Sequence, residues 1–167
     1  MGISFYRGCL VLMVTLFLSG TAFSAPLKPG DPAPDFSLAS LSGGTVRLSD
    51  YKGNIVVLGL FHICEPCKEQ AEILEKIGQK LKAKGVKIVG VNASGNSRED
   101  VQAYVNAFET RVTFPYLIDP SEKISGLYSV RNTPNVYVLD RKGVIRFKGA
   151  FTQQANLEKV IASISNN

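Results

Sequence analysis

Hydrophobic and polar positions follow one another in blocks along the chain. The runs "NIVVLGLF" at 54–61 and "VKIVGV" at 86–91 are continuous and apolar, as is typical of strands buried on both faces. Between them, apolar residues recur at helical spacing and predict a helix over Pro66–Lys84 that ends at Gly85. Strand, helix and strand therefore alternate.

The alternation continues after the second strand. Ser97 followed by Asp100 resembles a capping box and predicts a helix that reaches about Phe108. The stretch "FPYLID" at 114–119 predicts a short strand, and 121–128 predicts a short helix.

Both ends of this alternating block carry hairpin patterns. "DFSLASLSGGTVRLSDY" has two short apolar-patterned runs joined around Gly43-Gly44, and "NVYVLDRKGVIRFKG" is expected to turn at 141–143. Apolar residues from Leu157 to Ile164 predict a final amphipathic helix. The pattern predicts an α/β fold: a central mixed sheet flanked by helices on both faces, with an N-terminal β-hairpin extension.

The N-terminus has a different pattern. From Cys9 to Phe23 the chain is apolar, follows a single Arg7, and ends in small residues, which is typical of a secretory signal. We expect residues 1–24 to be a signal peptide, with an uncleaved anchor as the alternative. Residues 25–167 are then the folded domain.

Composition narrows the functional classes. With 167 residues, 45% hydrophobic and 20% charged, the chain can form a core without a disulfide scaffold. Removing residues 1–24 leaves 18 basic and 14 acidic side chains, a net charge of +4. The sequence has no long run of like charges, so we expect no nucleic-acid partner. We also expect a monomer.

Two cysteines form a C-x-x-C pair, Cys64 and Cys67, where the first central strand meets its helix. Such a pair is a disulfide staple, a metal clip or a redox centre, depending on compartment and spacing. A structural disulfide across so short a loop would stabilise little, which favours a redox centre. In folds of this kind, sites gather beyond the carboxyl ends of the strands.

Four motifs together resemble the TlpA/ResA-like thioredoxin-fold family of the AhpC/TSA-redoxin superfamily: "GDPAPDFSL", "CEPCK", "FPYLID" and "VRNTPNVYVLDRKGVI". The resemblance implies a thioredoxin fold, thiol-disulfide exchange without a bound cofactor, and an exported protein in the periplasm or at the extracytoplasmic face. It also implies a membrane thiol reductant as electron donor. Disulfide-bearing exported proteins, apocytochrome c among them, would be the substrates.

The position of each cysteine suggests its role. Cys64 would lie at a helix N-terminus, where unpaired N–H groups and the dipole favour a thiolate, and would attack the partner. Cys67, one turn further, would resolve the mixed disulfide. Glu65 and Pro66 would tune the pair. A carboxylate beside Cys64 disfavours its thiolate and makes the dithiol a stronger reductant, although Lys68 would partly offset it.

The resemblance also places Thr133-Pro134 as a cis-proline loop that faces the cysteines and binds the partner chain. The proton acceptor for Cys67 is left unassigned, because Leu58 occupies the place of the family's usual buried acid and Glu99 lies too far along for confident transfer. His62 is the only histidine. As a cation it would lower the pKa of Cys64, and as an ordinary strand-end residue it needs no role.

Three alternatives stay open at this point. The domain would act as an oxidase or isomerase of secreted proteins if electrons flowed the other way. A Cu or Zn chaperone would use Cys64, Cys67 and His62 as soft ligands. A thiol peroxidase would share "GDPAPDFSL", but 57–63 lacks the Pro and the Thr or Ser that precede a peroxidatic cysteine. We therefore expect a reductant with no metal.

Overall fold

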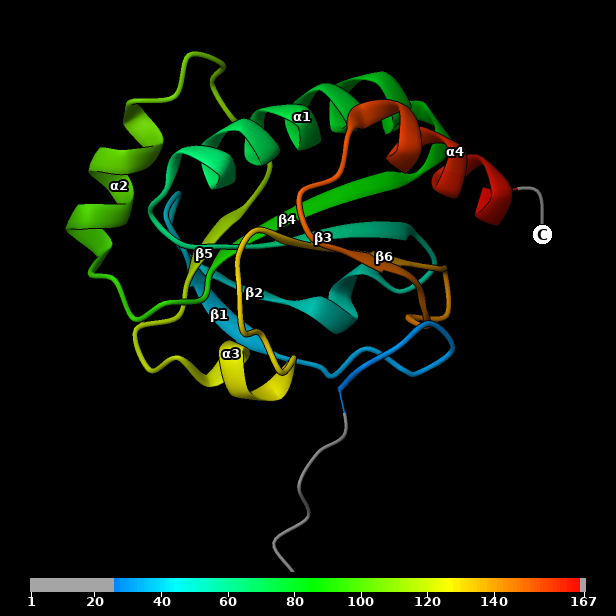
Figure 1. Cartoon of the computed structure of the whole chain (residues 1–167), viewed down its shortest axis with the longest axis horizontal. Helices are drawn as coiled ribbons and strands as arrows, with labels where there is room; N and C mark the ends of the chain where they lie inside the picture. The colour runs from blue at the N-terminus through cyan, green and yellow to red at the C-terminus, as the bar shows by residue number, and fades with distance from the viewer. Residues whose placement is uncertain (1–25, 166–167) are drawn as a thin grey trace, which may run out of the picture.

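A seven-stranded mixed sheet lies at the centre of the computed structural model, which describes residues 26–165 (Figure 1). The predicted signal peptide and Ala25 lie outside the described residues. In spatial order the strands are β2-β1-β5-β4-β3-β6-β7. Their bounds are β1 Ser37–Ser40, β2 Thr45–Arg47, β3 Ile55–Phe61, β4 Val86–Asn92, β5 Tyr116–Ile118, β6 Asn135–Leu139 and β7 Ile145–Gly149.

Parallel and antiparallel pairing divide the sheet. Strands β3, β4 and β5 are parallel, so their carboxyl ends meet at one edge. Strand β6 pairs antiparallel with β3, and β1 pairs antiparallel with β5. All seven residues of β3 are buried, which explains its uninterrupted apolar sequence.

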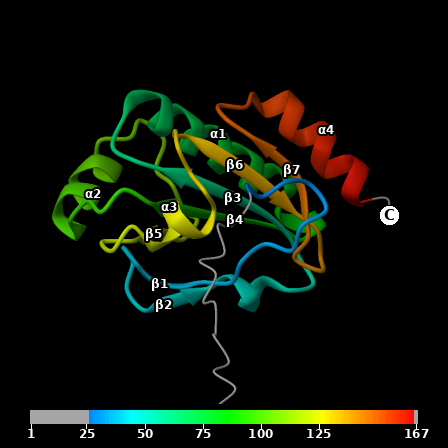
Figure 2. The same ribbon diagram turned by 60° about the horizontal axis from the view of Figure 1, so that its bottom comes forward.

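Helices cover both faces of the sheet (Figures 1 and 2). One face packs against α1, α2 and α4 in a core that includes Phe61, Cys67, Val101 and Leu157. The other face packs against α3, the first short helix and the N-terminal arm. The helices span η1 Leu48–Tyr51, α1 Glu65–Leu81, η2 Lys82–Lys84, α2 Arg98–Asn106, α3 Lys123–Leu127 and α4 Gln154–Ser165.

The predicted elements are present, with shifts at their ends. Helix α1 begins at Glu65, and its last turn tightens into a 3-10 turn before Gly85, whose φ of 74° ends the helix. The Ser97 side chain caps α2 by accepting a hydrogen bond from the Asp100 N–H at 3.1 Å. Helix α3 is shorter than predicted and begins at Lys123, because Glu122 before it is left-handed, with φ of 53°. The Asp119 carboxylate accepts from the Ile124 N–H in its first turn at 2.7 Å.

Within residues 26–165, the helices are too short or too polar to cross a membrane.

Candidate active site

The cysteine pair lies at the junction between β3 and α1. Cys64 has an extended backbone, with φ of −160° and ψ of 157°, and is the N-cap of α1. Its Sγ accepts a hydrogen bond from the Cys67 N–H at 3.2 Å, a position that Ser, Thr, Asp or Asn usually fills. The sulfur of Cys64 therefore lies among the unpaired N–H groups of the helix start.

Cys67 lies one turn inside the helix and is fully buried, whereas Cys64 is half-buried. Both are free thiols. Burial raises the pKa of Cys67 to about 12, and the hydrogen bond to the Cys64 side chain acts in the same direction. Cys67 is therefore a protonated thiol at neutral pH, and Cys64 is the sulfur that a partner can reach.

His62 and Thr133 meet beside the thiols. The His62 Nδ1 and the Thr133 Oγ1 share a hydrogen bond, and the same Nδ1 lies 3.7 Å from the Cys67 Sγ. The Thr133–Pro134 peptide bond is cis, as the resemblance implied, and Pro134 is buried. The structure thus brings together four site residues predicted from the sequence: His62, Cys64, Cys67 and Thr133. His62 and Thr133 are 71 positions apart in the sequence.

An open cavity lies beside His62 and Thr133. It has a volume of about 340 Å³ and is lined mainly by polar side chains: His62, Ser94, Ser125, Val130, Arg131, Asn132 and Thr133. Its lining joins the end of β3 to the loop before β6.

Glu65 and Pro66 lie in the exposed first turn of α1. The Lys68 Nζ lies 3.3 Å from a Glu65 carboxylate oxygen and 4.0 Å from one of Glu109, and the Glu65 side chain is 80% exposed. Exposed ion pairs contribute little to stability, so the tuning of the cysteine pair by Glu65 stays a prediction, and we expect it to be small.

Tyr104 of α2 is a site residue that the sequence did not reveal. Its hydroxyl donates to the Cys64 carbonyl at 2.5 Å, and its ring packs edge-on against Phe108 with centroids 4.9 Å apart. Burial raises the pKa of Tyr104. An aromatic residue on a helix is usually a core residue, so no local signal distinguished it.

Neither acid position considered from the sequence faces Cys67. Glu99 is exposed in the first turn of α2. Leu58 is fully buried and belongs to the core on the other face of the sheet. Neither position therefore supplies a buried carboxylate beside Cys67.

The cluster also bears on the metal alternative. Donor atoms of His62, Cys64 and Cys67 all lie within 4.8 Å of one another. Three donors are one fewer than a closed structural zinc site uses. The His62 Nδ1 already shares a hydrogen bond with the Thr133 hydroxyl, and the Cys64 Sγ accepts from the Cys67 N–H.

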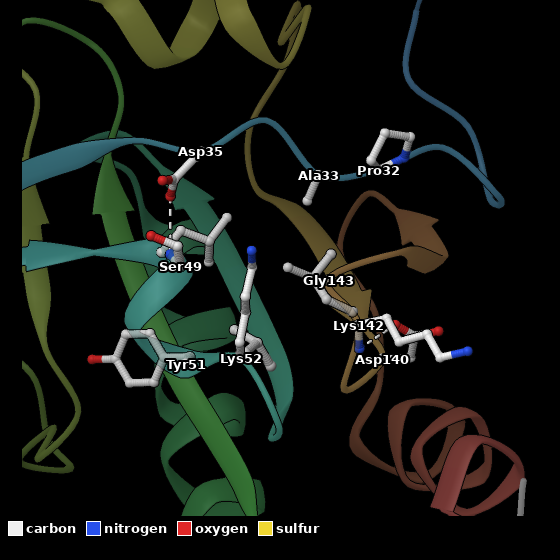
Figure 3. A pocket seen from close by; sticks show the side chains of 12 residues that line it. Pro32, Ala33, Asp35, Ser49, Tyr51, Lys52, Asp140, Lys142 and Gly143 are labelled. Atoms are coloured by element: carbon white, nitrogen blue, oxygen red, sulfur yellow. Dashed lines mark hydrogen bonds between the residues drawn. The ribbon is translucent and has the colours of Figure 1, made fainter.

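A second cavity, of about 200 Å³, lies at the opposite end of β3 (Figure 3). Lys52 extends between the Asp35–Ser49 contact and the turn at 140–143. Val56 and Leu139 form part of its wall. It is remote from the cysteines because Val56 is near the start of β3 and Cys64 follows its end.

Comparison with known proteins agrees with this geometry. Residues 29–148, most of the folded part, match the AhpC/TSA family. The chain belongs to this family. "Thioredoxin-like protein YneN" of Bacillus subtilis (strain 168) is 38% identical over 123 residues, which cover 72% of this chain and 70% of the relative.

Two further similar proteins carry names that state a chemistry. "Thiol-disulfide oxidoreductase ResA" of Geobacillus kaustophilus (strain HTA426) is 31% identical over 138 residues, 81% of this chain and 77% of the relative. A crystal structure from Chlorobium tepidum, provisionally assigned as thiol:disulfide interchange protein DsbE, has a TM-score of 0.75 at 29% identity. It is matched over 83% of this chain and 99% of its own. The protein is a thioredoxin-like thiol-disulfide oxidoreductase that acts on disulfide-bearing substrates.

Proposed function

We propose that this protein is exported and reduces disulfide bonds in other extracytoplasmic proteins. The observation that carries the proposal is the asymmetry of the pair: a half-buried Cys64 at the helix N-cap and a fully buried, protonated Cys67 one turn behind it. The Cys64 sulfur is accessible to a partner disulfide, and the buried Cys67 sulfur reacts only in the second step, as a two-step exchange requires.

The exchange proceeds in two displacements. The Cys64 thiolate attacks one sulfur of the partner disulfide, the partner S–S bond breaks, and the other partner sulfur leaves. Cys67 then attacks the Cys64 Sγ, forming the Cys64–Cys67 bond and breaking the mixed disulfide. The partner gains two electrons and two protons, and the protein is left oxidised.

The proposed direction of electron flow rests mainly on the resemblance, because the exposed Glu65 carboxylate is paired with Lys68 and adds only a weak anionic contribution beside Cys64. A membrane thiol reductant would return the electrons. By resemblance, apocytochrome c, with its C-x-x-C-H motif, is the expected substrate class.

The substrate proposal is tested with an oxidised C-x-x-C-H peptide. The reduced protein is mixed with the peptide, and acid-quenched thiols are alkylated and weighed by mass spectrometry. We expect a reduced peptide with the wild-type protein and a trapped peptide adduct with Cys67→Ser. Cys64→Ser is the matched control and should form no adduct. A peptide that stays oxidised while both variants remain free would refute this substrate.

Export is tested separately by N-terminal sequencing of the protein from fractionated cells. The signal peptide prediction requires an extracytoplasmic protein that begins at Ala25. A full-length cytoplasmic protein would contradict it.

A further inference from the structure

We propose that His62 accepts the proton of Cys67 in the resolving step, on Nδ1, and that Thr133 is the positioning residue that holds the ring in place. The inference rests on the two-step exchange described above and assigns the proton acceptor that the sequence left open.

The resolving step creates the need for a base. A thiolate is the nucleophile in thiol-disulfide exchange, but Cys67 is fully buried and burial raises its pKa to about 12. Its proton must leave as the new sulfur–sulfur bond forms. The His62 Nδ1 lies 3.7 Å from the Cys67 Sγ, within reach for hydrogen bonding to sulfur. Histidine is also the most common general base in proteins.

Thr133 holds the ring in either protonation state. A hydroxyl both donates and accepts, so Thr133 can donate to an unprotonated Nδ1 and accept from a protonated one. Because Nδ1 has a single lone pair, the hydroxyl gives up its donation as the Cys67 proton arrives there and then accepts from the new Nδ1–H, so Thr133 holds the ring before and after the transfer. Before transfer, the neutral ring carries its hydrogen on Nε2, and Nδ1 faces Cys67.

The proton and electron movements balance. The proton passes from the Cys67 Sγ to the His62 Nδ1, and the Cys67 sulfur pair forms the bond to the Cys64 Sγ. The bond from Cys64 to the partner breaks, and the partner sulfur leaves with that electron pair. It is protonated by His62 or by water from the adjoining cavity, which His62 lines.

The groups around the ring allow the proton to leave again. Cys64 and Cys67 face it from α1, and Arg131 lies on the cavity that it lines. Tyr104 of α2 is directed to the Cys64 carbonyl. Carboxylates are absent from the described lining of the cavity, so no anion there traps a protonated His62.

The test follows the reactions of Cys64 and Cys67 as two separate kinetic phases. The reduced protein is mixed, with a chelator present, with a symmetrical aromatic disulfide whose thiolate is coloured. Attack by Cys64 releases the first coloured thiolate, and resolution by Cys67 releases the second. His62→Asn places an amide oxygen near the position of Nδ1, where it can accept from Thr133 but cannot take up a proton.

We expect His62→Asn to slow the second phase about 100-fold at neutral pH, the low end of general-base effects. The first phase should change less than about threefold, because Cys64 attack does not use His62 as a base. The deficit in the second phase should shrink as the pH rises, because hydroxide replaces the missing base. Thr133→Val should slow the second phase about fivefold, the cost of one hydrogen bond, and tests the proposal with His62 intact.

Glu99→Gln is the matched control and should leave both phases as in the wild-type protein. An unchanged second phase in His62→Asn would overturn the proposal, as would a deficit of the same size at every pH. A normal first phase shows that the variant is folded and that Cys64 exchanges. Loss of the first phase in the wild-type protein would instead refute the proposed function.

Discussion

Two tyrosines near the thiols, Tyr104 and Tyr116, differ in the hydrogen bonding of their hydroxyl groups. Replacing each by phenylalanine measures the effect of that difference on stability. The Tyr104 hydroxyl donates to the Cys64 carbonyl at 2.5 Å. The Tyr116 hydroxyl is buried and has no hydrogen-bond partner among residues 26–165. Replacing each tyrosine by phenylalanine removes one oxygen atom and leaves the ring.

The hydrogen bonds of each hydroxyl determine how much each substitution should change the free energy of unfolding. The Cys64 carbonyl also accepts from the Lys68 N–H at 3.1 Å, so Tyr104→Phe leaves it one partner and should cost about 1 kcal/mol. That corresponds to a melting temperature lower by about 4 °C. Tyr116→Phe removes an unpaired buried hydroxyl, so it should be neutral or stabilising by up to about 1 kcal/mol.

Urea unfolding of both variants under reducing conditions measures the difference. Linear extrapolation gives the free energy of unfolding, and an unchanged slope shows that the same surface is exposed. Equal destabilisation by the two substitutions would show that the hydrogen bond from Tyr104 to Cys64 contributes nothing, and would refute the reasoning.

Three further changes have defined outcomes. Glu75→Ala should lower the free energy of unfolding by about 2–3 kcal/mol in urea unfolding, because the buried carboxylate accepts from both the backbone N–H and hydroxyl of Thr113 at 2.7 Å. In Cys64→Ser, the Cys67 thiol should resist iodoacetamide at pH 8 and react only after unfolding, because burial raises its pKa. Mass spectrometry measures the alkylation, and alkylation of the folded protein at pH 8 would contradict this expectation. Glu65→Gln should raise the midpoint potential by less than about 20 mV in redox-buffer equilibration, and a larger rise would show a stronger coupling than an exposed pair has.

The pKa of Cys67 also fixes the direction of a pH effect. The folded protein holds the Cys67 proton more tightly than the unfolded chain does, so this group stabilises the dithiol form fully below about pH 9. That stabilisation is lost as the pH rises toward about 12.

The sequence predicted the order of strands and helices because each element carries its own periodicity. The buried strand β3 reads as a continuous apolar run, and α1 shows helical spacing before a terminating Gly85. Cys64 and Cys67 were identifiable because a C-x-x-C at a strand-to-helix junction is a local signal.

The contacts around the thiols depend on distant segments instead. His62 meets Thr133 across 71 positions, and Tyr104 reaches the Cys64 carbonyl across 40. Neither contact leaves a periodic trace in the sequence. The contact between Lys68 and Glu65 was anticipated from their spacing in the sequence, and the tuning of the pair by Glu65 stays a prediction.

The direction of electron flow is decided by the midpoint potential of the Cys64/Cys67 couple. The protein is equilibrated in graded redox buffers, and Cys67→Ser serves as a control that cannot form the internal disulfide. A reductant requires a potential near or below about −250 mV. A value of about −120 to −180 mV would place the protein among oxidases and isomerases and contradict the proposed direction.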